Sequence, residues 1–177
     1  TACAKIKGVS KIEFASANYM VQEICFFLEA LGVKIDGIGT STLTVHGVPD
    51  IDTNIEYWNS EDPIESMMFI SAAVMTDSKL TITRCPIDFL TLELYKLKKM
   101  GLKYKILKRY MARNNRTKLA DIEIMPSTLT APLDKIHANP YPGINMDNLP
   151  FFVPIAIKAK GQTMIHDWVY ENRAIYF

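Results

Sequence analysis

The sequence predicts a mixed α/β fold in which β-α-β-α-β-β units repeat and the helices are buried between sheets. One observation is that apolar residues alternate between a spacing of two, typical of strands, and a spacing of 3.6, typical of helices. A second is that similar segments recur. Gly32 and Gly101 each follow a helical pattern, 69 positions apart (101 − 32), and Asp62 and Asp147 each precede one, 85 positions apart (147 − 62). The repeat predicts a partial unit over 1–50, a complete unit over 51–128 and the start of a further unit over 129–177.

The first part of the chain should contain three strands and one helix. We expect strands over Lys11–Ala15, Val33–Gly37 and Ser41–Val45. Asn18 can cap a helix whose apolar residues lie on one face, and Gly32 ends that helix.

The middle of the chain restarts the same pattern. Asn54–Trp58 reads as a strand, and Asp62 followed by Pro63 marks the start of a helix that runs to Met75. This helix is apolar on almost every side, which predicts burial nearly all round. Lys79–Thr83 should be the next strand.

The second half of that unit is a helix followed by two strands. Pro86 is placed to begin a helix that Gly101 ends, and strands are expected over Leu102–Tyr110 and Lys118–Met125. The pattern then restarts once more. Asp147 should open an apolar helix to Lys160, with a strand over 163–167 after it. Parallel β-α-β crossovers would supply the sheet that each helix needs.

Composition excludes several kinds of function. The chain of 177 residues carries 20 Lys and Arg against 19 Asp and Glu, with no basic stripe interleaved with aromatic residues, so no nucleic-acid partner is expected. No apolar run reaches the roughly 18 residues of a membrane span, so no membrane partner is expected. Cys3, Cys25 and Cys85 form no CxxC pair and the histidines are scattered, which argues against a metal site and favours a cytoplasmic protein.

Two polar segments near the end of the chain are the candidates for chemistry. The first, 139–147, brings the Asp147 carboxylate to the point where a turn becomes a helix; the second, Val169–Arg173, follows a strand and includes Glu-Asn-Arg. From spacing alone, Asp147 is either a helix N-cap or a functional acid or base. Glu171 and Arg173 are either a structural ion pair or part of a binding site.

These segments resemble the acceptor side of the UDP-N-acetylglucosamine 1-carboxyvinyltransferase family of enolpyruvyl transferases, and the resemblance runs from about Lys11 to Phe177. It implies an inside-out α/β barrel, in which three such units surround a pseudo-threefold axis with their helices inside. This chain would hold one and a half to two of those units. Because the chain begins at Thr1 without Met and stops soon after a polar cluster, we expect one domain or a fragment of a longer enzyme.

The resemblance also implies a function. The enolpyruvyl group of phosphoenolpyruvate would move to the 3-hydroxyl of UDP-N-acetylglucosamine, in peptidoglycan precursor synthesis, with no metal or other cofactor. Asp147 would contact the attacking hydroxyl as its general base, and Val169 and Tyr170 would contact the nucleotide. Arg173 and Met146 complete the expected substrate-binding residues.

The other half of such a site is expected outside this sequence. The family's phosphoenolpyruvate-binding Lys, Arg and Asp, and its reactive Cys in a glycine-rich loop, have no counterpart that can be placed here. A second domain of the same enzyme is therefore the expected partner, and this chain alone should be inactive. Cys85 is interpreted as a core or cap residue before a helix.

Three residues depart from the family pattern. Met146 stands where the family has a hydroxyl side chain that helps to hold the nucleotide. Pro150 and Pro154 lie in a helix that usually lacks proline, and Pro154 should remove a hydrogen bond and kink it. These departures leave two alternatives: a transferase with another acceptor, such as shikimate 3-phosphate, or a non-catalytic relative that binds a nucleotide or a protein.

Overall fold

The structure, a computed structural model, describes residues 1–170 and consists of two compact units, one ending at Ser60 and the other beginning at Glu61. Each unit has its own apolar core. The finer division of the chain into repeat units at residues 50 and 128 stays a prediction.

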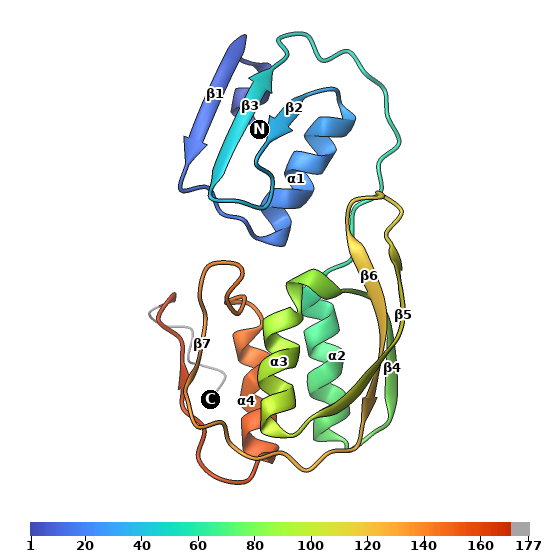
Figure 1. Ribbon diagram of the computed structural model, residues 1–177, viewed down its shortest axis with the longest axis vertical. Coiled ribbons are helices and arrows are strands. Elements are labelled where there is room, and N and C mark those ends of the chain that lie inside the picture. Colours follow the sequence, from blue (N-terminus) through green and yellow to red (C-terminus); the bar gives the residue numbers. More distant parts are fainter. Residues whose placement is uncertain (171–177) are drawn as a thin grey trace. The chain divides into compact units, whose positions relative to one another are not determined.

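The first unit is a three-stranded antiparallel sheet with one α-helix (Figure 1). Its elements are the 3-10 helix η1 (Ala2–Lys5), β1 (Gly8–Glu13), α1 (Tyr19–Ala30), β2 (Lys34–Asp36) and β3 (Thr42–Gly47). The strand order is β1-β3-β2. The predicted cap of α1 is confirmed, because the Asn18 side chain accepts a hydrogen bond from the Val21 N–H at 3.0 Å. Cys25 and Leu28 turn the buried face of α1 toward Leu43 and Val45 of β3.

The predicted strand at Asn54–Trp58 is wrong. Residues 51–62, all of them described, form neither helix nor strand. Side chains hold the segment instead: the Tyr57 hydroxyl donates to Glu23 Oε1 at 2.9 Å, and the Ser60 N–H donates to the same oxygen at 3.0 Å. The Tyr57 ring also meets the Phe27 ring edge-on, with 5.3 Å between centroids. A strand needs a free sheet edge, and the local sequence carries no information about that edge.

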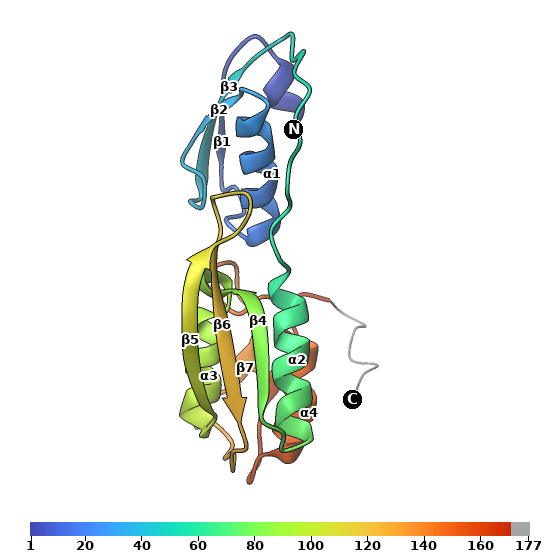
Figure 2. The same ribbon diagram turned by 90° about the vertical axis from the view of Figure 1, so that its right-hand side faces the viewer.

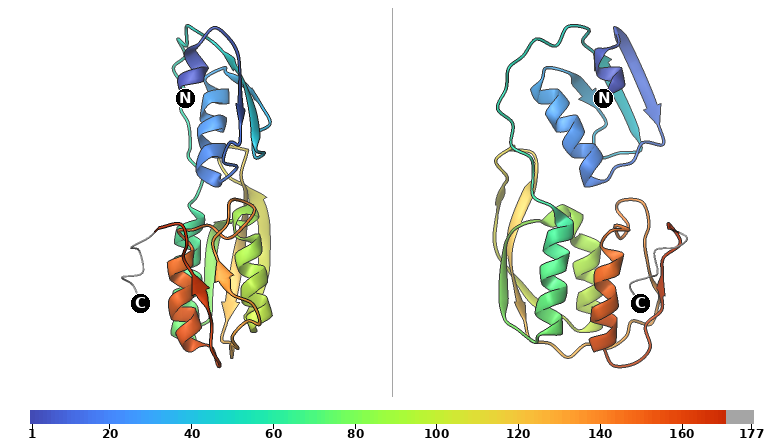
Figure 3. Two further views of the ribbon diagram at one scale, coloured as in Figure 1. Left: turned by 90° about the vertical axis from the view of Figure 1, so that its left-hand side faces the viewer. Right: turned by 180° about the vertical axis from the view of Figure 1, so that it is seen from behind.

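The second unit places its helices between two sheets (Figure 1). Its elements are α2 (Pro63–Met75), β4 (Leu80–Pro86), the 3-10 helix η2 (Ile87–Phe89), α3 (Thr91–Met100), β5 (Lys103–Met111), β6 (Lys118–Met125), β7 (Ile136–His137), α4 (Leu149–Lys158) and β8 (Ile165–His166). One sheet has the order β4-β6-β5 and is antiparallel; the other is the parallel pair β7-β8. Figure 3 shows the same layers from behind.

The two units repeat one topology. In each, a helix connects two strands that run parallel to one another but have a third, antiparallel strand between them. The predicted β-α-β crossovers therefore exist, and in both three-stranded sheets an antiparallel strand lies between the two strands that the crossover connects. The offset of 69 is confirmed at the helix ends. Gly32 and Gly101 adopt φ of 91° and 110°, and the N–H that follows each donates to Leu28 at 3.0 Å and to Leu97 at 2.9 Å.

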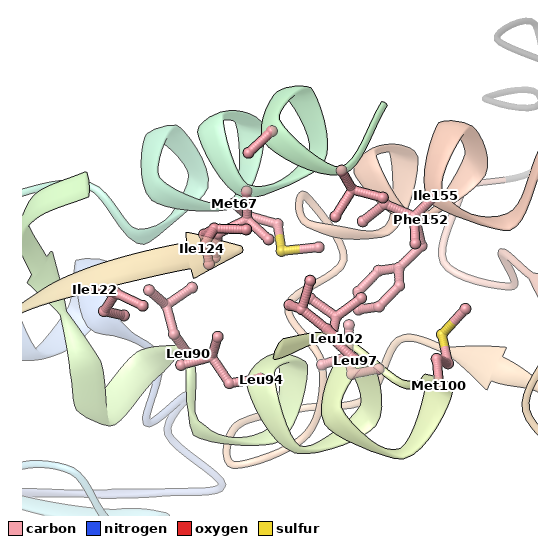
Figure 4. Close-up of a cluster of buried hydrophobic side chains, with 14 of the residues drawn as sticks. Met67, Leu90, Leu94, Leu97, Met100, Leu102, Ile122, Ile124, Phe152 and Ile155 are labelled. Carbon is pink, nitrogen blue, oxygen red and sulfur yellow. The ribbon is translucent and has the colours of Figure 1, made fainter. Parts of the chain in front are cut away.

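The core of the second unit lies between helices and sheet (Figure 4). Leu94, Leu97 and Met100 of α3 belong to the same buried cluster as Ile122 and Ile124 of β6, and α2 and α4 add further fully buried side chains, among them Met67, Ile70, Phe152 and Ile155. Figure 2 shows α2 and α4 side by side, and the Ser71 hydroxyl of α2 donates to the Phe151 carbonyl of α4 at 3.0 Å.

Helix α2 is less buried than its sequence predicts. Its Met68, Phe69, Ala72 and Met75 are exposed, so the expectation of burial nearly all round is wrong for this chain. The predicted start of the next helix at Pro86 is also wrong. Pro86 is the last residue of β4, and α3 begins only after η2. Asp62 does cap α2 as predicted, because its carboxylate accepts from the Ile64 N–H at 2.8 Å.

Candidate functional site

The candidate site forms where β7 and β8 end. These strands pair in parallel, with His137 opposite His166, so the segments that follow them leave from the same edge of the sheet. Those segments are residues 138–148 and 167–170. Binding and catalytic residues are often found on loops that a rigid scaffold positions, so the two segments at this edge are candidates for a functional site.

The segment after β7 forms a tight loop. The Asn139 N–H donates to the Ile144 carbonyl at 3.0 Å, and the Gly143 N–H donates to the Pro140 carbonyl at 2.8 Å. A Cβ at Gly143 would lie 2.4 Å from the Asn139 Cβ, so only glycine allows this close approach. The Tyr141 ring rests against Phe89, with 5.4 Å between centroids. A hollow of about 470 Å³ lies between this loop and α3.

Residues 145–148, the Asp147 turn, follow the loop. The Asn148 N–H donates to the Asn145 carbonyl at 3.0 Å, and the Asn145 side-chain oxygen accepts from the Asp147 N–H at 2.9 Å. Helix α4 begins at Leu149, and Asn148 occupies the N-cap position without a side-chain cap bond. The predicted helix start at Asp147 is therefore wrong, and so is the interpretation of Asp147 as the N-cap. Its half-buried carboxylate lies in the turn ahead of the helix.

Glu93 of α3 is hydrogen-bonded to this turn. Its Oε1 accepts from the Asn148 side-chain amide at 2.9 Å and from the Asn145 N–H at 3.2 Å. Glu93 is only 2% exposed and Asn148 is fully buried. Burial raises the pKa of Glu93 above its ordinary value, while the hydrogen bonds from Asn148 and Asn145 act in the opposite direction. The turn that carries Asp147 is thus anchored in the core.

Two of the predicted site residues lie against the same apolar core, and one hydrogen bond joins the two segments that carry them. Met146 of the Asp147 turn and Val169 after β8 are partly buried against the same apolar core. Trp168 donates its ring N–H to the Ala138 carbonyl at 2.7 Å, which ties the segment after β8 to the segment after β7. Tyr170 is 47% exposed. Arg173, together with Glu171 and Asn172, lies outside the described residues.

Cys85 behaves as predicted. It is fully buried, its thiol donates to the Ile82 carbonyl at 3.5 Å, and burial raises the pKa of that thiol. A thiol of this kind is a poor nucleophile. Within residues 1–170 the structure contains no group of three or more His, Cys, Asp or Glu side chains arranged to hold a metal ion. Over the same residues, no helix combines the length and apolar character that crossing a membrane requires.

The sequence reasoning missed Glu93. A signal for it exists, because Glu93 follows Leu90 by three positions and precedes Leu97 by four, on the face of α3 that is otherwise apolar. A lone carboxylate on such a face predicts a buried, hydrogen-bonded acid. Asn145 was also missed, although an Asn two residues before another polar residue is a common turn former.

Comparison with known proteins defines the class. Residues 2–176 match the family model described as EPSP synthase (3-phosphoshikimate 1-carboxyvinyltransferase). Since the match spans nearly the whole sequence, the chain belongs to this family of carboxyvinyltransferases. The predicted enolpyruvyl transferase fold is confirmed by solved structures. The enolpyruvyl transferase NikO from Streptomyces tendae superposes with a TM-score of 0.75 at 25% identity, over 97% of this chain and 38% of that one.

Individual relatives show which members of the family the chain resembles. The chain is 32% identical over 176 residues to the UDP-N-acetylglucosamine 1-carboxyvinyltransferase of Sulfurimonas denitrificans, and 31% identical over 172 residues to that of Chloroherpeton thalassium. These matches cover 99% and 97% of the chain but only 39% and 37% of the relatives. EPSP synthase from Acinetobacter baumannii shares the fold, with a TM-score of 0.62 at 20% identity over 93% of this chain and 36% of that one. The chain thus spans well under half the length of the proteins it matches.

Proposed function

We propose that the full-length protein transfers the enolpyruvyl group of phosphoenolpyruvate to the 3-hydroxyl of UDP-N-acetylglucosamine, and that this chain supplies the acceptor side of the site. The observation that carries the proposal is the similarity to UDP-N-acetylglucosamine 1-carboxyvinyltransferases over almost the whole chain. The geometry supports it, because the half-buried Asp147 carboxylate lies in a turn that hydrogen bonds to Glu93 anchor in the core.

The chemistry assigns one proton transfer to Asp147. In enolpyruvyl transfer the acceptor oxygen bonds to C2 of phosphoenolpyruvate while C3 gains a proton, which gives a tetrahedral intermediate. Inorganic phosphate then leaves as C3 loses a proton. Asp147 accepts or orients the proton of the attacking hydroxyl, and its anchored turn limits the positions that its carboxylate can take. Val169, Tyr170, Arg173 and Met146 contribute to binding of the nucleotide.

A second acceptor has a specific observation in its favour. The matching family model is described as 3-phosphoshikimate 1-carboxyvinyltransferase, and one structural neighbour is an EPSP synthase. Shikimate 3-phosphate is therefore the alternative acceptor. The reaction at the hydroxyl is the same, so Asp147 keeps its role and the residues around the remainder of the acceptor differ.

Substitution of Asp147 by Asn in the full-length protein tests the proposal. The amide keeps the size of the side chain but cannot take the proton. We expect turnover to fall by about two orders of magnitude or more, with a change in unfolding free energy below about 1 kcal/mol. Phosphate release would be measured with phosphoenolpyruvate and each of the two acceptors.

Asp134→Asn is the matched control, since the Asp134 side chain is 75% exposed and lies 3.9 Å from Lys96, and Asp134 precedes β7 whereas the Asp147 turn follows that strand. It should leave turnover unchanged. Near-normal turnover in Asp147→Asn would remove Asp147 from the chemistry. If the unsubstituted protein releases no phosphate with either acceptor, the non-catalytic alternative replaces the proposed transferase.

A further inference from the structure

Glu93 links helix α3 to the Asp147 turn through a short chain of hydrogen bonds. One carboxylate oxygen of Glu93 accepts from both ends of the turn, at 3.2 Å from the Asn145 N–H and 2.9 Å from the Asn148 amide. Asn145 in turn accepts from the Asp147 N–H at 2.9 Å. Two hydrogen bonds, both made by Asn145, therefore connect the buried carboxylate of Glu93 to the backbone of Asp147.

We propose that Glu93 is a positioning residue, which holds the Asp147 turn so that the Asp147 carboxylate points where the acceptor hydroxyl binds. The inference rests on the proposed role of Asp147. Glu93 acts through Asn145 and Asn148 and is not itself expected to touch the substrate. The turn lies outside α4, so the helix does not fix its shape. The hydrogen bonds from Asn145 and Asn148 to Glu93 fix it instead.

Loss of Glu93 would disturb the turn because Asn148 depends on it. Asn148 is fully buried, and its side-chain oxygen has no hydrogen-bond partner within the part of the chain that the structure describes. Without Glu93 its amide N–H groups would lose their acceptor as well. Buried donors without acceptors are costly, so the turn should shift toward water. The turn needs an acceptor oxygen rather than a charge. The side-chain oxygen of Gln in Glu93→Gln should therefore keep the turn in place, whereas Glu93→Ala leaves the turn without an acceptor.

The experiment compares four variants of the full-length protein: Glu93→Ala, Glu93→Gln, Leu94→Ala and Asp147→Asn. Leu94 is 2% exposed on the same helix and makes no bond to the turn, so Leu94→Ala controls for general loss of core packing. The measurements are kcat and KM from phosphate release, at a temperature where circular dichroism shows every variant folded. Hydrogen exchange at the Asn145 and Asp147 amides reports on the turn without reference to activity.

We expect Glu93→Ala to lower kcat by about 10- to 100-fold, the scale of a displaced catalytic group, with a KM change within about threefold. Its Asn145 and Asp147 amides should exchange faster. Glu93→Gln should have a kcat within about threefold of that of the unsubstituted protein. Leu94→Ala should keep both the kcat and the amide protection of the unsubstituted protein.

Three outcomes would overturn the inference while the proposed function stands: normal kcat in Glu93→Ala beside an inactive Asp147→Asn, an equal loss of kcat in Leu94→Ala, or no recovery in Glu93→Gln. If Asp147→Asn itself keeps normal turnover, the proposed function fails and the inference falls with it. The Asp147→Asn result thus separates the two kinds of failure.

Discussion

At the scale of single residues, Glu93 combines two properties that rarely occur together. It is almost completely buried, and the groups that its Oε1 contacts are amides rather than cations. Burial is the largest influence on its pKa and raises it above the ordinary value of 4.5. The titratable neighbour Tyr141 has its own pKa raised, first by burial, and stays neutral at mildly acidic and neutral pH.

This raised pKa makes a prediction about stability and pH. The native state holds the Glu93 proton more tightly than the unfolded chain, so stability is highest below the unfolded pKa and falls as the pH rises through the native pKa. The Gln side chain in Glu93→Gln cannot ionise, so this variant does not lose stability for this reason as the pH rises. The unfolding free energy of the variant, relative to the unsubstituted chain, should therefore increase as the pH rises from about 4 to about 8. Urea unfolding at several pH values measures it.

Glu65→Gln is the matched control, because Glu65 is an exposed Glu in the first turn of α2. It removes one negative charge from the surface and so controls for the change in net charge that Glu93→Gln also makes. A stability difference between Glu93→Gln and the unsubstituted chain that stays constant with pH would contradict the raised pKa.

The site residues show what a sequence can reveal at this scale. Asp147 was found because a carboxylate next to a helix start is visible in the pattern, but its place in a turn was not, since the helix begins two residues later. Glu93 lies 54 positions earlier (147 − 93) and meets the turn only in the folded chain. Contacts of that kind depend on tertiary packing, which local periodicity does not encode.

At the scale of elements, the helix ends were the most predictable features. Asn18 and Asp62 begin helices through side-chain oxygens that accept from a nearby backbone N–H, and Gly101 ends one through its own backbone N–H, so only near neighbours are involved. Such local chemistry is readable in sequence. Sheet pairing was not readable, because the insertion of a third strand between two parallel ones is decided by distant residues. The strand expected at Asn54–Trp58 failed for the same reason.

The repeated helix ends allow a matched comparison of two glycines. Gly101 and Gly32 both have positive φ, but a Cβ at Gly101 would lie 2.8 Å from the Thr128 carbonyl oxygen, whereas a Cβ at Gly32 would meet nothing within 4 Å. Gly32→Ala should therefore cost about 1 kcal/mol from backbone strain alone. Gly101→Ala should cost roughly 2 kcal/mol or more, because the carbonyl must also move.

Chemical unfolding of the two variants, followed by circular dichroism, measures this difference. Gly161→Ala adds an intermediate case, with φ of 101° and the nearest atom 3.2 Å from the added Cβ. Equal losses in Gly32→Ala and Gly101→Ala would mean that the Thr128 carbonyl yields at little cost.

At the scale of the whole molecule, the chain matches well under half the length of its relatives. The fold of both units and the turn that bears Asp147 are present in it. The cations that would bind the phosphate and carboxylate of phosphoenolpyruvate, and the group that would protonate C3, were not placed in this sequence. In transfers of this type, fixed charges around the developing transition state supply much of the rate enhancement.

The 177-residue chain alone should therefore fail to turn over phosphoenolpyruvate and UDP-N-acetylglucosamine, because an acceptor side without those charges lacks most of the stabilisation of the transition state. Purified chain would be assayed for phosphate release beside the full-length relative from Sulfurimonas denitrificans under the same conditions. The expected result is no release above the enzyme-free background. The Asp147→Asn chain, assayed in parallel, identifies any contaminating phosphatase, because such an enzyme would act equally in both samples. Release by the unsubstituted chain that disappears in Asp147→Asn would show that this chain carries a complete site.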